Sequence, residues 1–403
     1  MIKHKFINFY VVILLLIIIT SCSNEAPNNG IIEIDAYKKY PKLTLDLNDI
    51  AEIRYIPLRL GEDTIFLDPG VRRSFFAMSD KFFLQEVSHN DPKIVVYDYD
   101  GHPLYTIGNQ GRGPGEFMAP FNYVVDTSRN EVYISSVLQD QLIVYDTDGN
   151  YKRSAYFTRR LRMQNVDLIN SRTFIGYNPN ATYLVASWLS GADNIKKTGK
   201  TLTLIDLDSL SLVDFPDVSF ERIYNSNQIW TTSKSIVNSG GGFYFFSICS
   251  DTTYHISSSL EITPRFVDVS NYPNKGEIGI FPAIETDRYV FLCSHPTHYK
   301  GMRELDKKQI KLLAYDKVKK KLFDLNGEIV KKNPDGSSDS YSIEALNYFS
   351  FSFGKTLSPN YLVTSLSYIY LSENYANLPD TLKRITDNMT EKDNPVLQVV
   401  KFY

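Results

Sequence analysis

A glycine-rich segment at residues 111–117 (GRGPGEF) gives the clearest suggestion of binding chemistry in this sequence. The backbone N–H groups of such a loop can hold a phosphate, and the guanidinium of Arg112 could add hydrogen bonds to it. No Gly-Lys-Ser or Gly-Lys-Thr follows the loop, which excludes a P-loop. A structural role is favoured, because the glycines permit positive φ, Pro114 fixes a turn and Phe117 can pack between neighbouring elements. Arg112 and Glu116 are kept as candidate binding residues.

The only close pair of histidines is His295 and His298, within the segment SHPTHY at residues 294–299. A zinc site needs a third ligand and a rigid element beneath it, and the sequence contains no HExxH motif. The segment therefore indicates a polar loop, and neither a metal nor a cofactor is predicted. His295, His298 and Tyr299 are retained as candidate binding residues.

Aspartates recur shortly before glycine in the turns that begin at Asp98 and Asp146. These Asp-x-Asp-Gly turns resemble calcium loops, but the glycine comes too early for an EF-hand and no glutamate stands at the required distance. We interpret them as hairpin turns. Basic clusters at residues 159–162 and 317–321 are interpreted as solvated loops, which could attract anionic glycans if they shared one face.

Catalysis leaves no local trace in the sequence. There is no G-x-S-x-G elbow, and Cys249 and Cys293 each lie in an apolar, strand-like run where buried thiols are common. These two cysteines could form a disulfide in an oxidising compartment, an alternative that the sequence leaves open. A pair of glycosidase carboxylates is defined by its separation in space, which a sequence does not supply. No catalytic residue is assigned.

The N-terminal residues predict export. Lys3 and Lys5 precede an apolar run at residues 9–19 that is too short to span a bilayer and fits a secretory signal peptide. The Ile-Thr-Ser-Cys that follows resembles a bacterial lipobox, so residues 1–21 are expected to be removed and Cys22 to receive the lipid. Residues 22–50 then form a lipidated cysteine and an N-terminal tether, which begins with a polar stretch.

The composition favours an all-β body. The chain has 28 Tyr and 24 Phe beside two Trp, and 43% of its residues are hydrophobic, which excludes disorder and suits half-buried strands. Its 43 basic and 46 acidic residues give no reason to expect a nucleic-acid partner. One short amphipathic helix is expected at residues 378–389, where Pro379 suits the first turn and Leu382, Ile385 and Met389 share a face.

An internal repeat predicts the architecture. Residues 94–101 (IVVYDYDG) and 142–149 (LIVYDTDG) nearly superpose, and in each an apolar strand leads into an Asp-Gly turn and a second strand. This is the hairpin pattern of a β-propeller blade. A sixth anchor strand, at residues 396–403, ends the sequence. The residues taken as equivalent in the first five are Asp98, Asp146, Asp206, Ser257 and Asp316.

Closure of the ring determines the number of blades. The sixth anchor strand has no partner after it, and an unpaired edge there would favour aggregation. The strand predicted at residues 52–58 (EIRYIPL) can supply that partner. The sequence therefore predicts a six-bladed β-propeller over residues 51–403 that is closed by an N-terminal strand. Seven blades are the alternative, because residues 162–210 could contain a further pair of strands.

The segment IGNQGRGPGEF at residues 107–117, followed by Pro120, resembles the inter-blade signature of NHL-type propellers. More closely, the chain resembles the six-bladed β-propeller lipoproteins of Bacteroidetes (NHL/TolB-like) in its lipobox and in YIPL at 55–58, YDK at 315–317 and NPVL at 394–397. The NPDG at 333–336 departs from that pattern. The resemblance implies a ring of sheets around a central channel, on a lipid-anchored envelope protein of the outer membrane that faces the periplasm or the cell surface. It implies no reaction.

Two functions are compatible with these observations. The favoured one is a non-catalytic binding or scaffold module, in which tyrosine-rich loops at the channel mouth hold a glycan, a peptide or a partner protein of the envelope. The alternative is a polysaccharide hydrolase or lyase, with acid and base residues that converge at the channel mouth from different blades. The binding module is preferred because the sequence has no recognisable catalytic motif, and the only membrane contact expected is through the lipid anchor.

Overall fold

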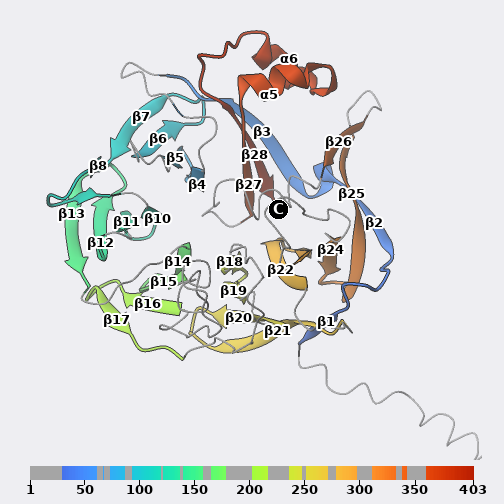
Figure 1. The fold of residues 1–403 in the computed structure, drawn as a ribbon, viewed down its shortest axis with the longest axis horizontal. Coiled ribbons are helices and arrows are strands. Elements are labelled where there is room, and N and C mark those ends of the chain that lie inside the picture. The colour runs from blue at the N-terminus through green and yellow to red at the C-terminus, as the bar shows by residue number, and fades with distance from the viewer. Residues whose placement is uncertain are drawn as a thin grey trace, which may run out of the picture. The chain divides into compact units, whose positions relative to one another are not determined.

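Six β-sheets follow one another around a ring in the computed structural model, and each sheet is one blade of a β-propeller (Figure 1). The ring lies within Glu33–Tyr403, which forms one compact unit of the chain. We name the blades A to F around the ring, starting from β4. The structure describes residues 30–60, 67, 73–86, 93–118, 121–136, 139–157, 165–177, 202–216, 236–246, 251–270, 278–296, 311–332, 338–342 and 360–403.

Blades A, B and C are four-stranded antiparallel sheets in which each strand pairs with its neighbour in the sequence. The third strand of each blade is packed on both faces, which explains its continuous apolar run; Ile94, Val95 and Val96 are all 0% exposed. The strands are β4 (Arg73–Ala77), β5 (Lys81–Glu86), β6 (Lys93–Asp98) and β7 (Pro103–Ile107) in blade A; β10 (Phe121–Asp126), β11 (Glu131–Ser136), β12 (Gln141–Asp146) and β13 (Tyr151–Tyr156) in blade B; and β14 (Asn165–Asn170), β15 (Thr173–Tyr177), β16 (Leu202–Asp206) and β17 (Ser211–Val213) in blade C.

Blades D and E have the same four-stranded core with further strands paired to the fourth one. Blade D contains β18 (Ile236–Ser239), β19 (Gly242–Phe246), β20 (Thr252–Ser257) and β21 (Ile262–Asp268), and blade E contains β22 (Ile278–Glu285), β23 (Tyr289–Pro296), β24 (Lys311–Asp316) and β25 (Lys321–Lys332). The added strands are β1 (Ile32–Ile34) on β21, and β2 (Lys42–Asp46) and β26 (Ser338–Ser342) on β25. Residues 22–50 are predicted from the sequence to form the lipidated cysteine and the tether, whereas the structure places β1 and β2, from the second half of that range, in the sheets.

Blade F closes the ring with strands from both ends of the chain. It consists of β27 (Tyr361–Leu366), β28 (Val396–Phe402) and β3 (Ala51–Pro57), which follows the short 3-10 helix η1 (Leu47–Asp49). Strand β28 pairs with β3 in unbroken antiparallel register, from Val396 opposite Pro57 to Phe402 opposite Ala51. The six-bladed ring and its closure by an N-terminal strand are therefore confirmed. Residues 162–210, on which the seven-bladed alternative depended, contribute β14, β15 and β16 to blade C.

The predicted repeat is also confirmed. Asp98, Asp146, Asp206, Ser257 and Asp316 each end the third strand of a blade. In the turn that follows each of them, the anchor side chain accepts a hydrogen bond from a backbone N–H; the donors are Asp100 and His102, Asp148 and Asn150, Asp208 and Ser209, Glu261, and Val318 and Lys319. The aspartates recur because each turn needs this acceptor.

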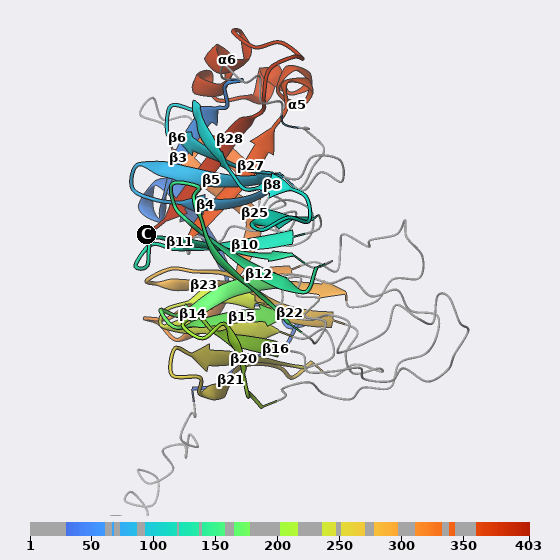
Figure 2. The same cartoon turned by 90° about the vertical axis from the view of Figure 1, so that its left-hand side faces the viewer.

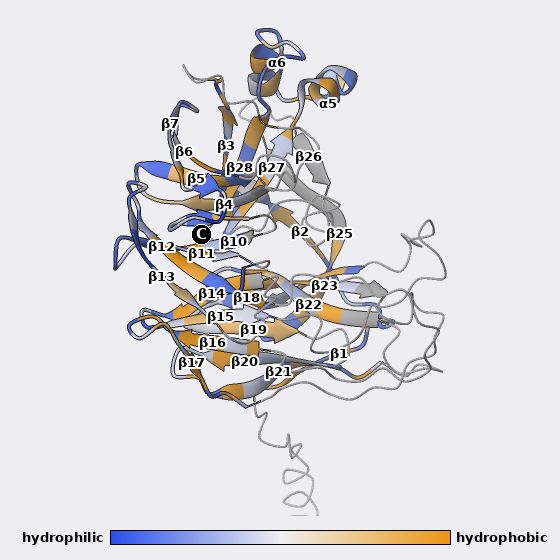
Figure 3. Cartoon of the chain, turned by 60° about the vertical axis from the view of Figure 1, so that its left-hand side comes forward, coloured by the Kyte–Doolittle hydropathy of each residue, from blue (hydrophilic) through white to orange (hydrophobic). Residues whose placement is uncertain are grey.

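Hydrophobic clusters between neighbouring blades form the core. Blades A and B bury Phe83, Val96, Ile134 and Ile143 against each other, and equivalent clusters join B to C, C to D, E to F and F to A. Figure 3 shows hydrophobic residues concentrated on the strands and hydrophilic ones at the tight turns. Each blade is thus stabilised mainly by its two neighbours, which makes closure of the ring important for all of them.

Two helices stand between β27 and β28, whereas the sequence predicted one. The predicted helix is confirmed as α6 (Asp380–Thr386), which is shorter than expected and has Pro379 at its N-cap, while α5 (Tyr368–Glu373) and the 3-10 turn η3 (Tyr375–Asn377) precede it. Leu382 is buried in a small cluster against which Ile385 packs, as predicted. Helix α5 was missed because its Tyr-Ile-Tyr sequence suits a strand; the hydroxyl of Ser367 accepts the N–H of Tyr370 at 3.2 Å and starts the helix. No helix in the described ranges is long and apolar enough to cross a membrane.

The contact between blades F and A depends on a glycine. Gly101 has φ +85°, and a Cβ at this position would lie 2.1 Å from the carbonyl oxygen of Pro57. Gly241 has nearly the same φ, +86°, but a Cβ there would meet no atom within 4 Å. We expect Gly241→Ala to lower the free energy of unfolding by about 1–2 kcal/mol through its backbone conformation alone. Gly101→Ala should cost clearly more, because it also pushes β3 away from blade A. Urea unfolding of both variants measures the difference, and equal losses would contradict this role for Gly101.

Candidate functional site

The glycine-rich segment is the connection between blades A and B, as its structural interpretation predicted. After β7 the chain passes through Gly108, with φ +65°, and forms β8 (Asn109–Gln110) and β9 (Glu116–Phe117), a short parallel pair. The Phe117 side chain is 0% exposed and belongs to the cluster between the two blades. The Tyr145 hydroxyl donates a hydrogen bond to the carbonyl oxygen of Gly115, which fixes the loop on blade B.

The carboxylate of Glu116 lies inside this loop, at the position that an anion would have to take. It accepts the backbone N–H of Gly113 at 2.7 Å, and a Cβ on Gly111 would lie 2.0 Å from one of its oxygens. The N–H of Gly111 donates to the carbonyl oxygen of Phe117 at 3.0 Å. The backbone donors of Gly111 and Gly113 are therefore engaged within the loop, which argues against a phosphate cradle and gives Glu116 a structural role.

Gln139, which sequence reasoning missed, attaches the loop to blade B. Its amide oxygen accepts the backbone N–H of Met118 at 3.0 Å and the Ser136 hydroxyl at 2.7 Å, and its amide nitrogen donates to the carbonyl oxygen of Gly111 at 3.3 Å. No local signal marks this residue, because the two loop residues that it contacts, Met118 and Gly111, are distant in the sequence. Arg112 is exposed above the same loop, with its Nε 3.3 Å from the sulfur of Met118. Its guanidinium is accessible for binding, whereas Glu116 is engaged by the loop.

The turn after Asp98 brings together three groups that could hold a metal ion: the side chains of Asp98, Asp100 and His102, whose ligand atoms lie within 4.8 Å of one another. The equivalent turn after Asp146 explains this cluster without a metal. There Nδ2 of Asn150 donates to the second carboxylate oxygen of Asp146 at 2.9 Å, and in the first turn Nδ1 of His102 lies 3.1 Å from the same oxygen of Asp98. Both turns thus place a hydrogen-bond donor four residues after the anchor aspartate. The hairpin interpretation therefore explains why His102 lies beside Asp98.

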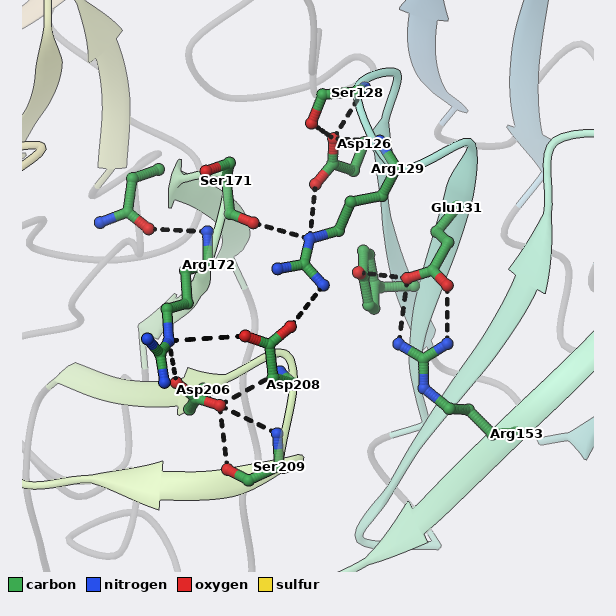
Figure 4. A network of polar contacts seen from close by, with 12 residues as sticks. Asp126, Ser128, Arg129, Glu131, Arg153, Ser171, Arg172, Asp206, Asp208 and Ser209 are labelled. Atoms are coloured by element: carbon green, nitrogen blue, oxygen red, sulfur yellow. Dashed lines mark hydrogen bonds and ion pairs between the residues drawn. The ribbon is translucent and has the colours of Figure 1, made fainter.

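Charged side chains connect blades B and C at their tight turns (Figure 4). Arg129, in the turn between β10 and β11, donates to the carboxylate of Asp208 at 2.7 Å and to the carbonyl oxygen of Ser171 at 2.8 Å. Arg172 then reaches Asp206 at 2.7 Å and Asp208 at 3.6 Å. The N–H of Ser209, with the guanidinium of Arg172, lowers the pKa of Asp206 below its usual range. The contacts of Arg129 hold blades B and C together, Arg172 pairs within blade C, and each of these four charged side chains has a partner of opposite charge.

A similar contact links blades A and B. The ammonium of Lys81, at the start of β5, donates to the Tyr105 hydroxyl at 2.8 Å and to the carboxylate of Asp148 at 3.2 Å. Tyr105 in turn donates to the carbonyl oxygen of Thr147 at 2.6 Å. The turns on this side of the ring therefore serve as contacts between blades.

Glu131, the first residue of β11, is a buried acid that is 4% exposed. Burial alone would raise its pKa, but hydrogen bonds from Arg153 at 2.6 and 3.0 Å, from Lys152 and from the Tyr133 hydroxyl outweigh burial and lower the pKa to about 2. The carboxylate stays ionised at neutral pH and binds the outer strand β13 to β11. This is the arrangement of a structural ion pair, since a general acid needs a raised pKa.

The pH dependence of stability should report this carboxylate. Because folding lowers the pKa of Glu131 from 4.5 to about 2, its contribution is complete above pH 4.5 and is lost as the pH falls toward 2. We expect Glu131→Gln to be less stable than the wild type at pH 7 and to lose less stability between pH 5 and pH 2. Thermal unfolding over that range measures the effect. If the wild type and Glu131→Gln lose stability in parallel, Glu131 is not the source of the pH dependence. Glu261→Gln, which removes an acid from an exposed turn, is the control and should behave like the wild type.

The remaining residues selected from the sequence are not brought together in the described part of the chain. His295 lies on β23, opposite Gly279 of β22, while His298, Tyr299 and Cys22 fall outside the described residues. Cys249 also lies outside them. Cys293 is 1% exposed, and burial raises the pKa of its thiol well above the usual range, as expected for an unreactive core cysteine.

Comparison with known proteins gives a family and a fold. The family model described as "Domain of unknown function (DUF4934)" matches residues 30–401. Among solved structures, a protein of Bacteroides fragilis described as exported superposes with a TM-score of 0.60 at 16% identity, covering 93% of this chain and 99% of that one. A DUF4221 family member from Bacteroides vulgatus gives a TM-score of 0.49 at 12% identity, with 88% and 99% covered.

A curated relative matches only a small part of the chain. The DNA mismatch repair protein MutL of Clostridium acetobutylicum is 32% identical over 85 residues, which are 20% of this chain and 13% of that protein. The chain therefore spans about an eighth of the length of that relative. The Bacteroides fragilis structure, by contrast, extends over almost the whole propeller and supports its fold.

Proposed function

We propose that this chain, which belongs to the DUF4934 family, is a non-catalytic binding or scaffold module of the cell envelope that holds a glycan, a peptide or a partner protein. Its lipid anchor would be Cys22, in the outer membrane. The observation that carries the proposal is the difference between the two faces of the ring. At one face, short turns join consecutive strands and their side chains contact the neighbouring blade. At the other face, consecutive strands are separated by longer stretches of sequence.

The side chains at the first face stabilise the fold. The turns from Asp126 to Glu131, from Asn170 to Thr173 and from Asp206 to Ser211 are short, and their charged side chains pair with one another, within blade C and between blades B and C. Figure 2 shows these turns along the left side of the ring and β8 on the opposite side. A rigid scaffold of this kind is well suited to present binding residues at its other face.

The strand ends at the second face are separated by longer stretches of sequence. Residues 178–201 join β15 to β16, and residues 297–310 join β23 to β24. The glycine-rich loop lies at this face too, because it follows β7 at the end opposite the turn after Asp98. Exposed Arg112 at this loop is the described residue best placed to contact a ligand, and its guanidinium suits a carboxylate, a sulfate or the hydroxyls of a sugar.

The titration of the described acids supports binding over catalysis. Within the described ranges, every aspartate or glutamate with a shifted pKa has it lowered, by turn N–H groups or by arginine and lysine. These carboxylates remain ionised at neutral pH and act as fixed partners. A hydrolase or lyase would place a proton donor of raised pKa beside a base.

Arrays of glycans and peptides, probed with the soluble domain that begins at Ile31, test the proposal. We expect at least one ligand class to bind and to be recovered unchanged when each hit is analysed for products. For an anionic ligand, Arg112→Ala should weaken binding by about tenfold, the value of one charge-assisted hydrogen bond. Lys321→Ala, which removes an exposed cation beside a tight turn on the first face, should leave binding unchanged. Turnover of any bound ligand would establish an enzyme instead.

A further inference from the structure

The segment that precedes β3 runs along the outside of the ring. We name residues 30–46 the N-terminal strap: it places β1 at the outer edge of blade D, turns at residues 35–40, and places β2 at the outer edge of blade E before η1 leads into β3. The carbonyl oxygen of Ile34 accepts the N–H of Val269 at 3.0 Å, and that of Pro41 accepts the N–H of Asp324 at 2.8 Å. The strap is thus attached to two consecutive blades as extra strands.

The ring is complete without the strap. Blades A, B and C have four strands each, and blades D and E already have four when β1 and β2 are left out. Closure depends on β3 and β28, which pair without a register shift, whereas β2 pairs with β25 in parallel and with an irregularity between Leu43 and Leu45. Parallel pairing is slightly weaker per residue than antiparallel pairing. The strap therefore has a weaker attachment than the strand that closes the ring.

Few side chains hold the strap in place. Ile34, Ala36 and Leu45 are buried at 0%, 3% and 6% exposure, and the N–H of Ala36 donates to the Ser270 hydroxyl at 2.7 Å. Most of the other strap side chains are exposed or half-buried, including Lys38 and Thr44. The attachment is specific, since Ile34 and Ala36 fill buried positions, but it covers a small apolar area.

The edges beneath the strap differ from the outer edges of blades A to C. Among the described residues no strand pairs with the outer side of β7, β13 or β17, and each of these edges has a feature that opposes pairing: Pro103 begins β7, Lys152 and Arg153 lie on β13, and β17 has only three residues. Strands β21 and β25 also contain a proline or lysines, but with seven and twelve residues they are longer than the other three, and the strap covers part of each edge.

From this geometry we propose that the strap is detachable, and that the outer edges of β21 and β25 form a binding site for an extended peptide, occupied here by residues 30–46 of the same chain. The site takes a strand with small or branched apolar side chains at the positions of Ile34, Ala36 and Leu45. Binding of this kind adds a strand to an existing sheet edge through main-chain hydrogen bonds.

Detachment would lengthen the tether, a consequence that rests on the proposed anchor at Cys22. With the strap bound, the part of the chain attached to the ring begins at β1. With the strap released, it begins at β3, which adds up to about 60 Å of reach at the length of an extended chain. The ring could then bind ligands at two distances from the membrane without unfolding.

Hydrogen exchange on the full chain tests the detachment. We expect the amides of Val269 and Asp324, which donate to the strap, to exchange about 100-fold faster than those of β28, because local opening requires less free energy than unfolding of the ring. Ile34→Asp should accelerate these two amides at least tenfold further and leave β28 unchanged. Thr44→Asp, at an exposed strap position, is the matched control and should change neither. Equal rates for the strap contacts and β28 would show that the strap unfolds only with the ring and would overturn the proposal.

A synthetic peptide tests the binding site. A fluorescent peptide of residues 30–46 should bind saturably to the full-chain Ile34→Asp variant, whose own strap is weakened, and a peptide that itself carries Ile34→Asp should bind at least tenfold more weakly. Failure of the wild-type peptide to bind would overturn the site. These measurements use neither the anchor nor an external ligand, so their failure is distinguishable from failure of the proposed function.

Discussion

Replacing Leu397 with aspartate should prevent the ring from closing. Leu397 lies in the middle of β28, opposite Ile56 of β3, and is 1% exposed in the cluster shared by blades F and A. An unpaired carboxylate there would lose the apolar contacts of leucine and would be buried without a hydrogen-bond partner, at a cost of several kcal/mol. Since domains are typically stable by about 5–15 kcal/mol, we expect the variant to be largely unfolded or to unfold at a far lower urea concentration.

Lys401→Asp is the matched control for this variant. Lys401 lies on the same strand, opposite Glu52, and is exposed, so the substitution changes charge without entering the core. Its midpoint of urea unfolding should remain close to that of the wild type, apart from a small loss through repulsion from Glu52. If Leu397→Asp unfolds at the same urea concentration as Lys401→Asp, closure by β3 and β28 does not determine the stability of the ring.

The features that the sequence predicted correctly are those produced by local patterns. Third strands buried on both faces have continuous apolar runs, and the aspartate that ends each run is required by its own turn, so the repeat could be recognised without coordinates. Closure followed from a count of strands and partners. The strap did not follow, because the tether was predicted from the polar residues that begin it and was extended to residue 50. The role of residues 30–46 depends on the edges of blades D and E, which a sequence does not display.

The contacts of the candidate site could not be predicted from the sequence, because they too depend on which segments the fold brings together. Glu116 has the composition of a binding residue, yet its carboxylate turns back to the N–H of Gly113, which depends on the conformation of the loop. Gln139 and the Arg129–Asp208 pair join segments that are distant in the chain, and many other glutamines and charges would have been equally plausible. Arg112 is exposed at the loop, and its role in binding stays a prediction.

Phe117→Ala should be the most damaging substitution within the glycine-rich connection. The ring of Phe117 is fully buried between blades A and B, in a cluster with Ile107 and Tyr145, and a Cβ on Gly108 would lie 2.6 Å from it. Removal of this side chain leaves a cavity that the surrounding β-strands cannot fill without shifting two blades. We expect the free energy of unfolding to fall by about 3–5 kcal/mol, as for other buried phenylalanines.

Pro114→Ala in the same loop separates packing from loop conformation. Pro114 is exposed and its loss should cost at most about 1 kcal/mol, through the greater freedom of the unfolded chain. Urea unfolding of both variants gives the comparison. Phe117→Ala should also leave the loop that carries Arg112 less well fixed. Ligand binding by this variant should therefore be weaker than that of the wild type even without urea, where the ring remains folded. A Phe117→Ala protein as stable as Pro114→Ala would mean that the connection merely links the two blades and that their contact is held by the strands alone.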